Sequence, residues 1–240
     1  MENLILWSLN LFFPKECVSC GRTLSYQNRD FLCPDCARFL FRVGAAVCEK
    51  CGRRLPGEIT PPIICGACVT SPLAFDRARS SLLLEGTGQD FVAAFKYGES
   101  PHLAEPAGRW MKDAGDTYYR WSDYDLIVPV PLHHRKKRER GFNQSELLGR
   151  RLSRLTGIAF SRRKLIRCRY TRTQTRLNPK ERKMNVRGAF RVSDGKYFGR
   201  KKLLLIDDVY TTGATVNECS LTLKKAGASR VDILTLARAI

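Results

Sequence analysis

The stretch K-K-L-L-L-I-D-D-V-Y-T-T-G-A-T, residues 201–215, decides the fold of this chain. Its continuously apolar part, Leu203–Ile206, predicts a central strand of a parallel sheet, because a strand covered on both faces shows no polar alternation. Asp207 and Asp208 follow, then a short turn, and then a pattern over 214–226 that predicts a helix. In an open parallel sheet, ligands bind beyond the carboxyl ends of the strands. We therefore expect both carboxylates at the ligand-binding edge.

The turn between this strand and helix is suited to a phosphate group. A helix N-terminus presents unpaired N–H groups and the positive end of the helix dipole. Hydroxyl donors are available from Thr211, Thr212 and Thr215. Two carboxylates beside a phosphate site fit a sugar phosphate, because the carboxylates accept hydrogen bonds from vicinal hydroxyls while the turn holds the 5′-phosphate. The same pattern also fits a generic strand–turn–helix unit with exposed aspartates.

The rest of the C-terminal part predicts an α/β domain. Apolar runs predict strands at 77–84, 125–132, 164–167, 189–193 and 230–236, and helical periodicity predicts helices at 88–97, 101–114 and 143–156. Prolines end the second strand near Val130, and Asn143 is a candidate helix cap. Strands that alternate with helices indicate a parallel sheet covered on both faces. The basic, poorly periodic segment 169–187 predicts a long loop, of the kind that forms lids.

Positive charge is concentrated in one block of the chain. The formal net charge is +19, and residues 133–202 contain 24 of the 42 Lys and Arg residues but only 4 of the 23 Asp and Glu residues. Such a block attracts phosphates, either on a nucleotide-like molecule or along a nucleic acid strand. A solvated basic surface without a partner is the alternative.

The sequence contains no apolar run of the roughly 18 residues that a membrane span needs. The apolar start, residues 1–14, carries Glu2 in place of a positive segment and has no small-residue cleavage site. We expect it to form a short amphipathic helix that docks on the body, with contact to a membrane surface as the alternative. The expected location is the cytoplasm.

Eight of the ten cysteines form four Cys-x-x-Cys pairs within the first 70 residues. Two such pairs supply four sulfurs to a tetrahedral zinc ion. Sequential pairing predicts two structural zinc sites, Cys17, Cys20, Cys33 and Cys36 in one and Cys48, Cys51, Cys65 and Cys68 in the other. Interleaved pairing, as in RING-like domains, stays open, and a disulfide framework is disfavoured by the regular spacing. The predicted domains are a double zinc-ribbon domain over 1–70 and an α/β domain over 71–240.

Two resemblances refine these expectations. The segment L-L-L-I-D-D-V-Y-T-T-G-A-T resembles the PRPP-binding signature of type I phosphoribosyltransferases. The segments 128–144 (V-P-V-P-L-H-H-R-K-K-R-E-R-G-F-N-Q), 172–190 and 95–98 (F-K-Y-G), together with the Cys-x-x-Cys pairs, resemble the ComF family of competence-associated and GntX-type proteins. That resemblance implies a zinc module followed by a type I phosphoribosyltransferase-like domain.

The resemblance also implies roles for individual residues. Asp207 and Asp208 would contact the ribose hydroxyls of PRPP, which binds with Mg²⁺. The remaining residues implied in PRPP binding are Val209, Tyr210, Thr211, Thr212, Gly213, Ala214 and Thr215 around the 5′-phosphate, and Leu132 and His133, with His134, near the diphosphate. The segment 170–187 would be the lid, whose Arg172 and Arg176, with Lys180 and Arg182, neutralise leaving pyrophosphate. The implied catalytic residues are therefore Asp207, Asp208, Arg172 and Arg176.

Two functions follow from these features. The first is the handling of single-stranded DNA in natural transformation, with PRPP binding retained and the competence machinery as a partner. The dense basic cluster 135–140 is either the solvated start of a helix or a contact for the phosphate backbone, with Arg135, Lys136, Lys137, Arg138 and Arg140 as its DNA-binding residues. Phe142 and Tyr170 flank basic runs and would either stack on bases or pack internally. The second function is that of an active phosphoribosyltransferase, which moves ribose-5-phosphate from PRPP to a nucleobase or other nitrogen acceptor with release of pyrophosphate. We favour the first as the biological role.

Overall fold

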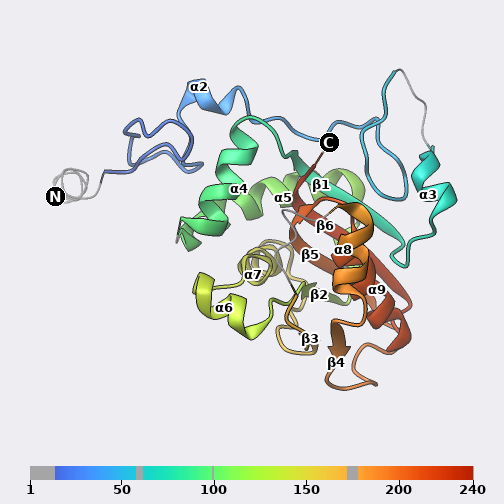
Figure 1. Ribbon diagram of the computed structural model, residues 1–240. Helices are drawn as coiled ribbons and strands as arrows, with labels where there is room; N and C mark the ends of the chain where they lie inside the picture. The colour runs from blue at the N-terminus through green and yellow to red at the C-terminus, as the bar shows by residue number, and fades with distance from the viewer. Residues whose placement is uncertain (1–13, 58–61, 99, 172–177, 240) are drawn as a thin grey trace.

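A four-stranded parallel sheet lies at the centre of the molecule, in the order β1–β6–β5–β2 (Figure 1). The structure is a computed structural model that describes residues 14–57, 62–98, 100–171 and 178–239. The strands are β1 (Arg77–Leu83), β6 (Arg230–Arg238), β5 (Lys202–Tyr210) and β2 (Leu126–Pro129). Each neighbouring pair is parallel. The predicted parallel α/β fold is confirmed.

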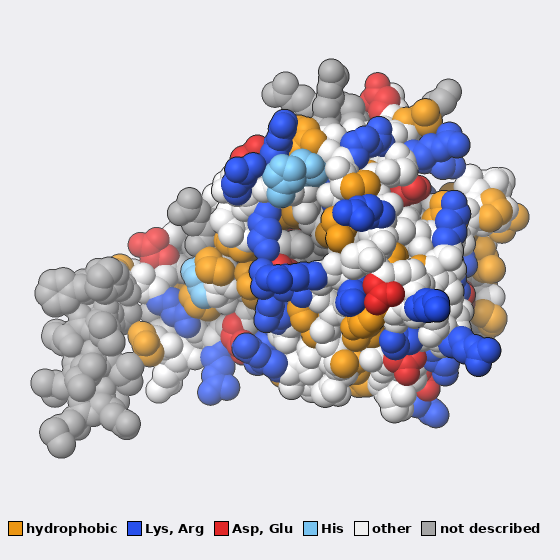
Figure 2. Space-filling view, turned by 90° about the horizontal axis from the view of Figure 1, so that it is seen from below, with side chains coloured by type: hydrophobic (Ala, Val, Ile, Leu, Met, Phe, Trp, Pro, Cys, Tyr) orange, Lys and Arg blue, Asp and Glu red, His pale blue; other side chains and the backbone are white. Residues whose placement is uncertain are grey.

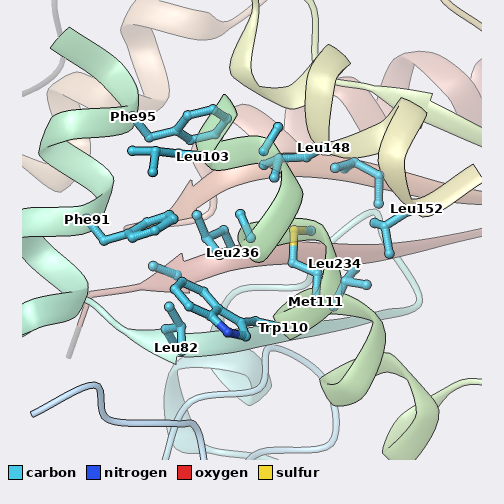
Figure 3. Packing of buried hydrophobic residues seen from close by; sticks show 14 of the residues in the cluster. Leu82, Phe91, Phe95, Leu103, Trp110, Met111, Leu148, Leu152, Leu234 and Leu236 are labelled. Atoms are coloured by element: carbon cyan, nitrogen blue, oxygen red, sulfur yellow. The ribbon is translucent and has the colours of Figure 1, made fainter. Parts of the chain in front are cut away.

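Helices cover both faces of this sheet because its strands are apolar on both sides. In β5, Leu204 and Ile206 pack in one hydrophobic cluster, whereas Leu203 and Leu205 pack in the other. The helices on the first face are α4 (Thr87–Tyr97), α5 (Ala104–Tyr118) and α7 (Gln144–Thr156), whose buried side chains meet the sheet in Figure 3. The second face is covered by α9 (Ala214–Lys225) and a separate antiparallel pair, β3 (Leu165–Arg167) and β4 (Phe190–Val192).

Local sequence signals set the ends of helix α7. The Asn143 side chain accepts a hydrogen bond from the backbone N–H of Ser145 at 3.1 Å, so the predicted cap is confirmed. Gly157 ends the helix with φ of 76°, a left-handed conformation that glycine adopts without strain. The first turn of the helix lies beside the carboxyl end of β5, where the Ser145 side chain contacts Asp207.

Two helices lie outside the ranges for which helical periodicity predicted one, although a solvated helix start was the alternative for 135–140. The first is α6 (His134–Arg140), and the second is α8 (Pro179–Val186), inside the segment 169–187 that we predicted to be a loop. The loop prediction was wrong for α8. Helices were predicted from apolar periodicity, and neither α6 nor α8 has such a pattern. A cap starts α8 instead: Asn178 and Glu181 each bond the other's backbone N–H, followed by Pro at the first helical position. Residues 172–177, with Arg172 and Arg176, lie outside the described residues.

Strand β5 also continues further than predicted, through Tyr210. The two aspartates therefore lie within the last part of this strand, and only the turn follows it. The predicted helix near 101–114 consists of a 3₁₀ turn, η1 (Pro101–Leu103), followed by α5, and a second 3₁₀ turn, η2 (Trp121–Asp123), precedes β2. The amphipathic helix predicted over 1–14 falls outside the described residues except for its last position.

The two cysteine-rich modules contact opposite parts of the α/β domain. The first module (Cys17, Cys20, Cys33, Cys36), with α2 (Pro34–Ala37), lies on α4, where Thr87 Oγ1 donates to the Cys36 carbonyl at 2.8 Å. The second module (Cys48, Cys51, Cys65, Cys68), with α3 (Gly66–Thr70), lies against β1 and β6. The chain between the modules covers the free edge of β1, with Val43 N–H bonded to Ser81 and Leu83 N–H to Phe41. The predicted boundary at residues 70 and 71 stays a prediction.

Within the described ranges, none of the helices has the length and apolar character needed to cross a bilayer.

Candidate ligand pocket and cysteine centres

The strand register leaves part of β5 open beside the shorter strand β2. Strand β2 pairs with β5 only over Leu203–Ile206, whereas β6 continues alongside β5 to Tyr210. Asp207 and Asp208 therefore lie beyond the carboxyl end of β2 and face the space that this short strand leaves. The expectation that both carboxylates lie at the ligand edge agrees with this register.

Two helices supply partners for these carboxylates. Asp207 Oδ1 accepts a hydrogen bond from Ser145 Oγ at 2.8 Å, and Asp208 Oδ2 lies 3.2 Å from Lys96 Nζ. Burial first, and then the adjacent charge of Asp208, raise the pKa of Asp207 to about 7, although the hydrogen bond from Ser145 and the charge of Lys96 lower it. At neutral pH the Asp207 carboxyl is therefore partly protonated.

A pocket of about 250 Å³ opens above these carboxylates. Its charged lining consists of five cations, namely Lys96, Lys136, Arg140, Arg167 and Arg182, and two carboxylates, Asp207 and Asp208. These groups come from α4, α6, β3, α8 and β5, so the fold and not the sequence brings them together. An excess of cations around a carboxylate pair matches a ligand with several anionic oxygens and a few hydroxyl donors.

Arg167 is a buried cation in this lining. It is 9% exposed, its guanidinium lies 5.3 Å from the centre of the Phe190 ring, and one Nη donates to Thr171. Its Nε is buried without a hydrogen-bond partner among the described residues. Burial lowers the pKa of Arg167, but a guanidinium stays charged at any physiological pH. A buried guanidinium with an unused donor is suited to a bound anion.

The sequence analysis did not assign Arg167 a role in the site. The available signal was weak: a charged residue directly follows two apolar strand residues, Leu165 and Ile166, as Asp207 follows Ile206. Lys96 and Ser145 were missed for a different reason. Each lies at one end of a helix that is distant in sequence from β5, so only the tertiary fold brings it to the carboxylates.

The predicted phosphate turn joins β5 to α9. Gly213 has φ of 76°, and a Cβ there would lie 2.3 Å from the Tyr210 hydroxyl oxygen. Both the left-handed conformation and the close approach therefore require glycine. Thr211 and Thr215 line the pocket with the carboxylates. Thr212 and Ala214, with Tyr210 and Gly213, line a second cavity on the other side of the turn.

This second cavity is a wide groove of about 1130 Å³. The second cysteine module forms one wall through Cys51 and Cys68, and residues of α8 and α9 form the other. Arg182 and Thr211 line both the pocket and the groove, so the two spaces adjoin at these residues. Apart from His133, the residues predicted to bind PRPP thus divide between two neighbouring spaces.

The remaining predicted residues have different surroundings. Leu132 and Val209 line the pocket, whereas His133 lines neither cavity. His133 is 5% exposed, and its ring lies 4.0 Å from that of His134 and 5.3 Å from that of Tyr170. Of the five basic residues predicted for nucleic acid binding, Lys136 and Arg140 line the pocket and the other three do not.

The cysteines assemble in two sequential sets of four, within which the sulfur atoms lie less than 4.8 Å apart. The sulfurs of Cys20 and Cys33 are 3.7 Å apart, and those of Cys51 and Cys65 are 3.8 Å apart. Tetrahedral zinc with Zn–S bonds of about 2.3 Å requires about 3.8 Å between sulfurs. Both sets therefore fit zinc, and they are consistent with a double zinc ribbon.

Each set is built in the same way, as expected for an internal repeat. Gly21 N–H bonds to the Cys17 carbonyl at 2.9 Å, and Gly52 N–H bonds to the Cys48 carbonyl at 2.8 Å, with both glycines in the left-handed conformation. Burial raises the pKa of Cys17, but backbone N–H groups from Cys20 and Cys33 outweigh it and bring the pKa to about 6. Such N–H groups favour the thiolate form that binds metal.

Fold and site together define a class: a parallel α/β domain with a carboxylate and cation pocket at its sheet edge, preceded by two four-cysteine modules. A family model described as a double zinc ribbon domain matches residues 8–69. DNA utilization protein YhgH of Salmonella typhimurium is 31% identical, over 96% of this chain and 100% of its own length. Competence protein F of Haemophilus influenzae is 29% identical over 95% of this chain and 99% of its own length, and competence protein ComFC of Streptococcus pneumoniae is 28% identical over 93% and 100%.

The chain therefore belongs to the family that contains competence protein F and DNA utilization protein YhgH, and the resemblance to the ComF family is confirmed. Among solved structures, the allosteric regulatory enzyme of purine biosynthesis matches 60% of this chain and 30% of its own, with a TM-score of 0.41 and 19% identity. Purine phosphoribosyltransferase from Pyrococcus horikoshii matches 56% of this chain and 73% of its own, with a TM-score of 0.37 and 18% identity.

Proposed function

We propose that the pocket binds PRPP together with Mg²⁺. The observation that carries this proposal is the carboxylate pair, Asp207 and Asp208, within a lining of five cations. A diphosphate needs several cations, a ribose needs acceptors for its hydroxyls, and a 5′-phosphate needs backbone N–H groups at a helix start. All three are present within one pocket of about 250 Å³ and its adjoining turn.

The positions of the groups suggest how the ligand lies. The ribose hydroxyls donate to Asp207 and Asp208, and the 5′-phosphate lies on the turn 211–215. The diphosphate then faces Arg167 and Lys136, two cations in the lining of the same pocket, whose positive charges compensate the negative charges of the ligand. Bound Mg²⁺ neutralises part of the diphosphate charge, as metal ions do at phosphoryl groups.

Binding also requires two exchanges within the protein. Lys96 leaves Asp208 for a phosphate oxygen, because its Nζ lies 3.2 Å from the carboxylate that the ribose needs. Asp207 releases its proton, since a hydroxyl donor is best accepted by the ionised carboxylate. Ser145 positions Asp207 through the 2.8 Å hydrogen bond and stays in place.

A calorimetric titration tests this part of the proposal. Mg²⁺ and PRPP are titrated into the wild-type protein and into the Asp207→Asn/Asp208→Asn variant, with Asp194→Asn as the control on an exposed loop. We expect saturable binding with one site per chain in the wild type and the control, and loss of binding in the double variant. No binding by the wild type would exclude PRPP as the ligand.

We further propose that the protein handles single-stranded DNA in natural transformation, with the competence machinery as its partner. The relatives' names, competence protein F and DNA utilization protein, support this role. The basic helix α6 supports it physically, since it places five Lys and Arg side chains within seven residues. The two four-cysteine sets hold zinc as structural ions in this proposal, and their thiolates need the reducing conditions of the cytoplasm.

Salt dependence tests the DNA-binding role. If several phosphates are engaged, the logarithm of the affinity for a single-stranded oligonucleotide falls with the logarithm of salt concentration, at about −0.7 per phosphate contact. We expect a steep slope for the wild type. A flat response, or no binding at low salt, would exclude this role.

An active phosphoribosyltransferase is the second candidate, and one observation favours it. The groove of about 1130 Å³ adjoins the pocket at Thr211 and Arg182, so an acceptor has a path to the ribose. In that reaction the acceptor nitrogen bonds to C1 of the ribose as the bond to pyrophosphate breaks. Pyrophosphate takes the electron pair, and the acceptor nitrogen loses its proton to solvent. Pyrophosphate release from PRPP that depends on an added nucleobase would establish turnover. If no base in a panel causes pyrophosphate release, the pocket binds PRPP without turnover.

A further inference from the structure

Helix α6 carries five cations, Arg135, Lys136, Lys137, Arg138 and Arg140, but little compensating negative charge. Its own Glu139 is the single acidic residue in the helix. Across the described parts of the chain, Lys137 is the one member of this set within ion-pair distance of a carboxylate, 3.3 Å from Glu146. The remaining four are available to an anionic partner.

An exposed tyrosine lies at each end of this helix. At the carboxyl end, the Arg140 guanidinium lies 5.4 Å from the ring centre of Tyr97, which is 63% exposed. At the amino end, the Arg135 guanidinium lies 5.6 Å from the ring centre of Tyr170, which is 44% exposed. Figure 2 shows Lys and Arg side chains gathered around the histidines on one face of the molecule. The two rings thus flank the most basic element of the fold.

Phe142 was the other aromatic candidate, and its surroundings argue against a role in stacking. It packs against the core cluster of α4 and α7, with its ring 6.1 Å from that of Phe95. Tyr97 differs because it lies at the end of α4, where its ring reaches the surface, and it lines the pocket together with Lys136 and Arg140. The surface with the two tyrosines therefore continues into the mouth of the pocket.

We propose that Tyr97, Tyr170 and α6 form a binding surface for single-stranded nucleic acid, in which bases stack on the two rings and phosphates bind the α6 cations. Aromatic rings beside a basic track are the pattern by which proteins bind single strands without sequence preference. Arg135 and Arg140 are about 8 Å apart along the helix axis. That span corresponds to roughly two nucleotides at the stacked rise of about 3.4 Å, so one short strand can contact both ends of the helix, where the two rings lie.

This inference rests on the proposed DNA-binding role and adds to it the residues of the binding surface and a mode of binding. A duplex cannot use the rings, because its base faces are already stacked on one another. The surface therefore discriminates single strands from duplexes. The surface also places the nucleic acid strand next to bound PRPP, because Lys136 and Arg140 belong to α6 and line the pocket as well.

Fluorescence anisotropy with a labelled single-stranded oligonucleotide, over a series of salt concentrations, tests the inference. Tyr97→Ala and Tyr170→Ala should each weaken binding about 5- to 100-fold, with the salt slope unchanged because no phosphate contact is removed. Tyr→Phe at either position should restore binding. The Arg135→Ala/Arg138→Ala variant should instead flatten the slope by about 1.4, or about 0.7 per contact. Tyr26→Ala, at an exposed tyrosine of the first module, is the matched control and should bind like the wild type.

Three results would overturn the inference while the DNA-binding role survives: tyrosine variants that bind single strands like the wild type, tyrosine variants that flatten the salt slope, and tyrosine variants that weaken duplex binding equally. Failure of the wild type to bind single strands would instead reject the DNA-binding role itself. Because both rings are exposed, thermal unfolding of the alanine variants should match that of the wild type, which separates loss of contact from loss of fold.

Discussion

At the scale of single residues, the pocket contains charged side chains whose burial lowers the stability of the ligand-free protein. Asp207 has its pKa raised to about 7, so at alkaline pH the folded protein must hold a second charge beside Asp208. Arg167 is a buried cation whose Nε has no partner in the described part of the chain. Functional sites commonly carry such costs, which ligand binding then offsets.

The Asp207→Asn substitution should stabilise the ligand-free protein at alkaline pH. The pKa of Asp207 is raised in the folded state, so its contribution to stability is full below its unfolded pKa of about 3.9 and is lost as pH rises towards 7. Removal of the charge should raise the free energy of unfolding at pH 8 by about 2–4 kcal/mol, and by much less at pH 5. Urea unfolding at both pH values measures this, and an equal gain at the two pH values would contradict the assignment.

The Arg167→Met substitution should weaken PRPP binding by at least about tenfold, because hydrogen bonds to a charged group contribute about 1.5–3 kcal/mol. Stability of the ligand-free protein should change little, since a buried charge with no carboxylate within ion-pair distance among the described residues is replaced by an apolar group. Arg163→Met, at an exposed position on the approach to the same strand, is the control. Equal PRPP affinity in both variants would remove Arg167 from the site.

At the scale of elements, the β5–α9 turn depends on one glycine. Gly213 and Gly157 share a φ of 76°, but a Cβ at Gly213 would overlap the Tyr210 ring whereas nothing lies within 4 Å at Gly157. The two sites therefore carry the same backbone strain and differ only in space.

Gly213→Ala should accordingly cost about 1–3 kcal/mol more stability than Gly157→Ala, and should abolish PRPP binding because the phosphate turn must move. Thermal unfolding and calorimetric titration of the two variants measure these effects. Similar losses of stability in both would mean that Tyr210 moves aside freely, and intact PRPP binding in Gly213→Ala would place the phosphate elsewhere.

The elements that the sequence predicted are those with a repeating apolar pattern. The strands β1, β5 and β6 and the helix α7 follow from apolar runs or from helical periodicity with a cap. Helices α6 and α8 lack that pattern, since α6 is entirely charged or polar and the apolar residues of α8 are Pro179, Met184 and Val186 alone. Both helices form through capping and through contacts that only the folded chain supplies. The pair Asp207 and Asp208 was predictable because it directly follows an apolar run. Arg167 was not, because its approach to Asp207 depends on the tertiary packing of β3.

At the scale of the whole molecule, the second cysteine module is part of the wall that surrounds the site. Arg238 donates to the Cys51 carbonyl at 2.7 Å, and Arg79 donates to the Glu49 carbonyl at 3.0 Å, so the first Cys-x-x-Cys turn of the module holds β6 and β1. Gly52 is needed there, because a Cβ would lie 2.5 Å from the Ala78 carbonyl oxygen. Loss of this module should therefore disturb the α/β domain.

Metal analysis of the purified protein should find two zinc ions per chain. Cys17→Ser and Cys48→Ser should each reduce the content to one, because three sulfurs bind zinc more weakly than four. The Cys48→Ser variant should also unfold at a lower temperature than Cys17→Ser, since Arg79 and Arg238 lose their ordered carbonyl partners. A zinc content near zero in the wild type would contradict the assignment of both sites.

The central claim is that PRPP binds at the carboxyl end of β5, and a crystal structure of the protein with PRPP and Mg²⁺ tests it most directly. We predict ribose hydroxyls on Asp207 and Asp208, the 5′-phosphate on the turn 211–215 and the diphosphate facing Arg167. Ligand density in the wide groove beside the second cysteine module with none on Asp207 and Asp208, or no ordered ligand at saturating PRPP, would contradict the claim.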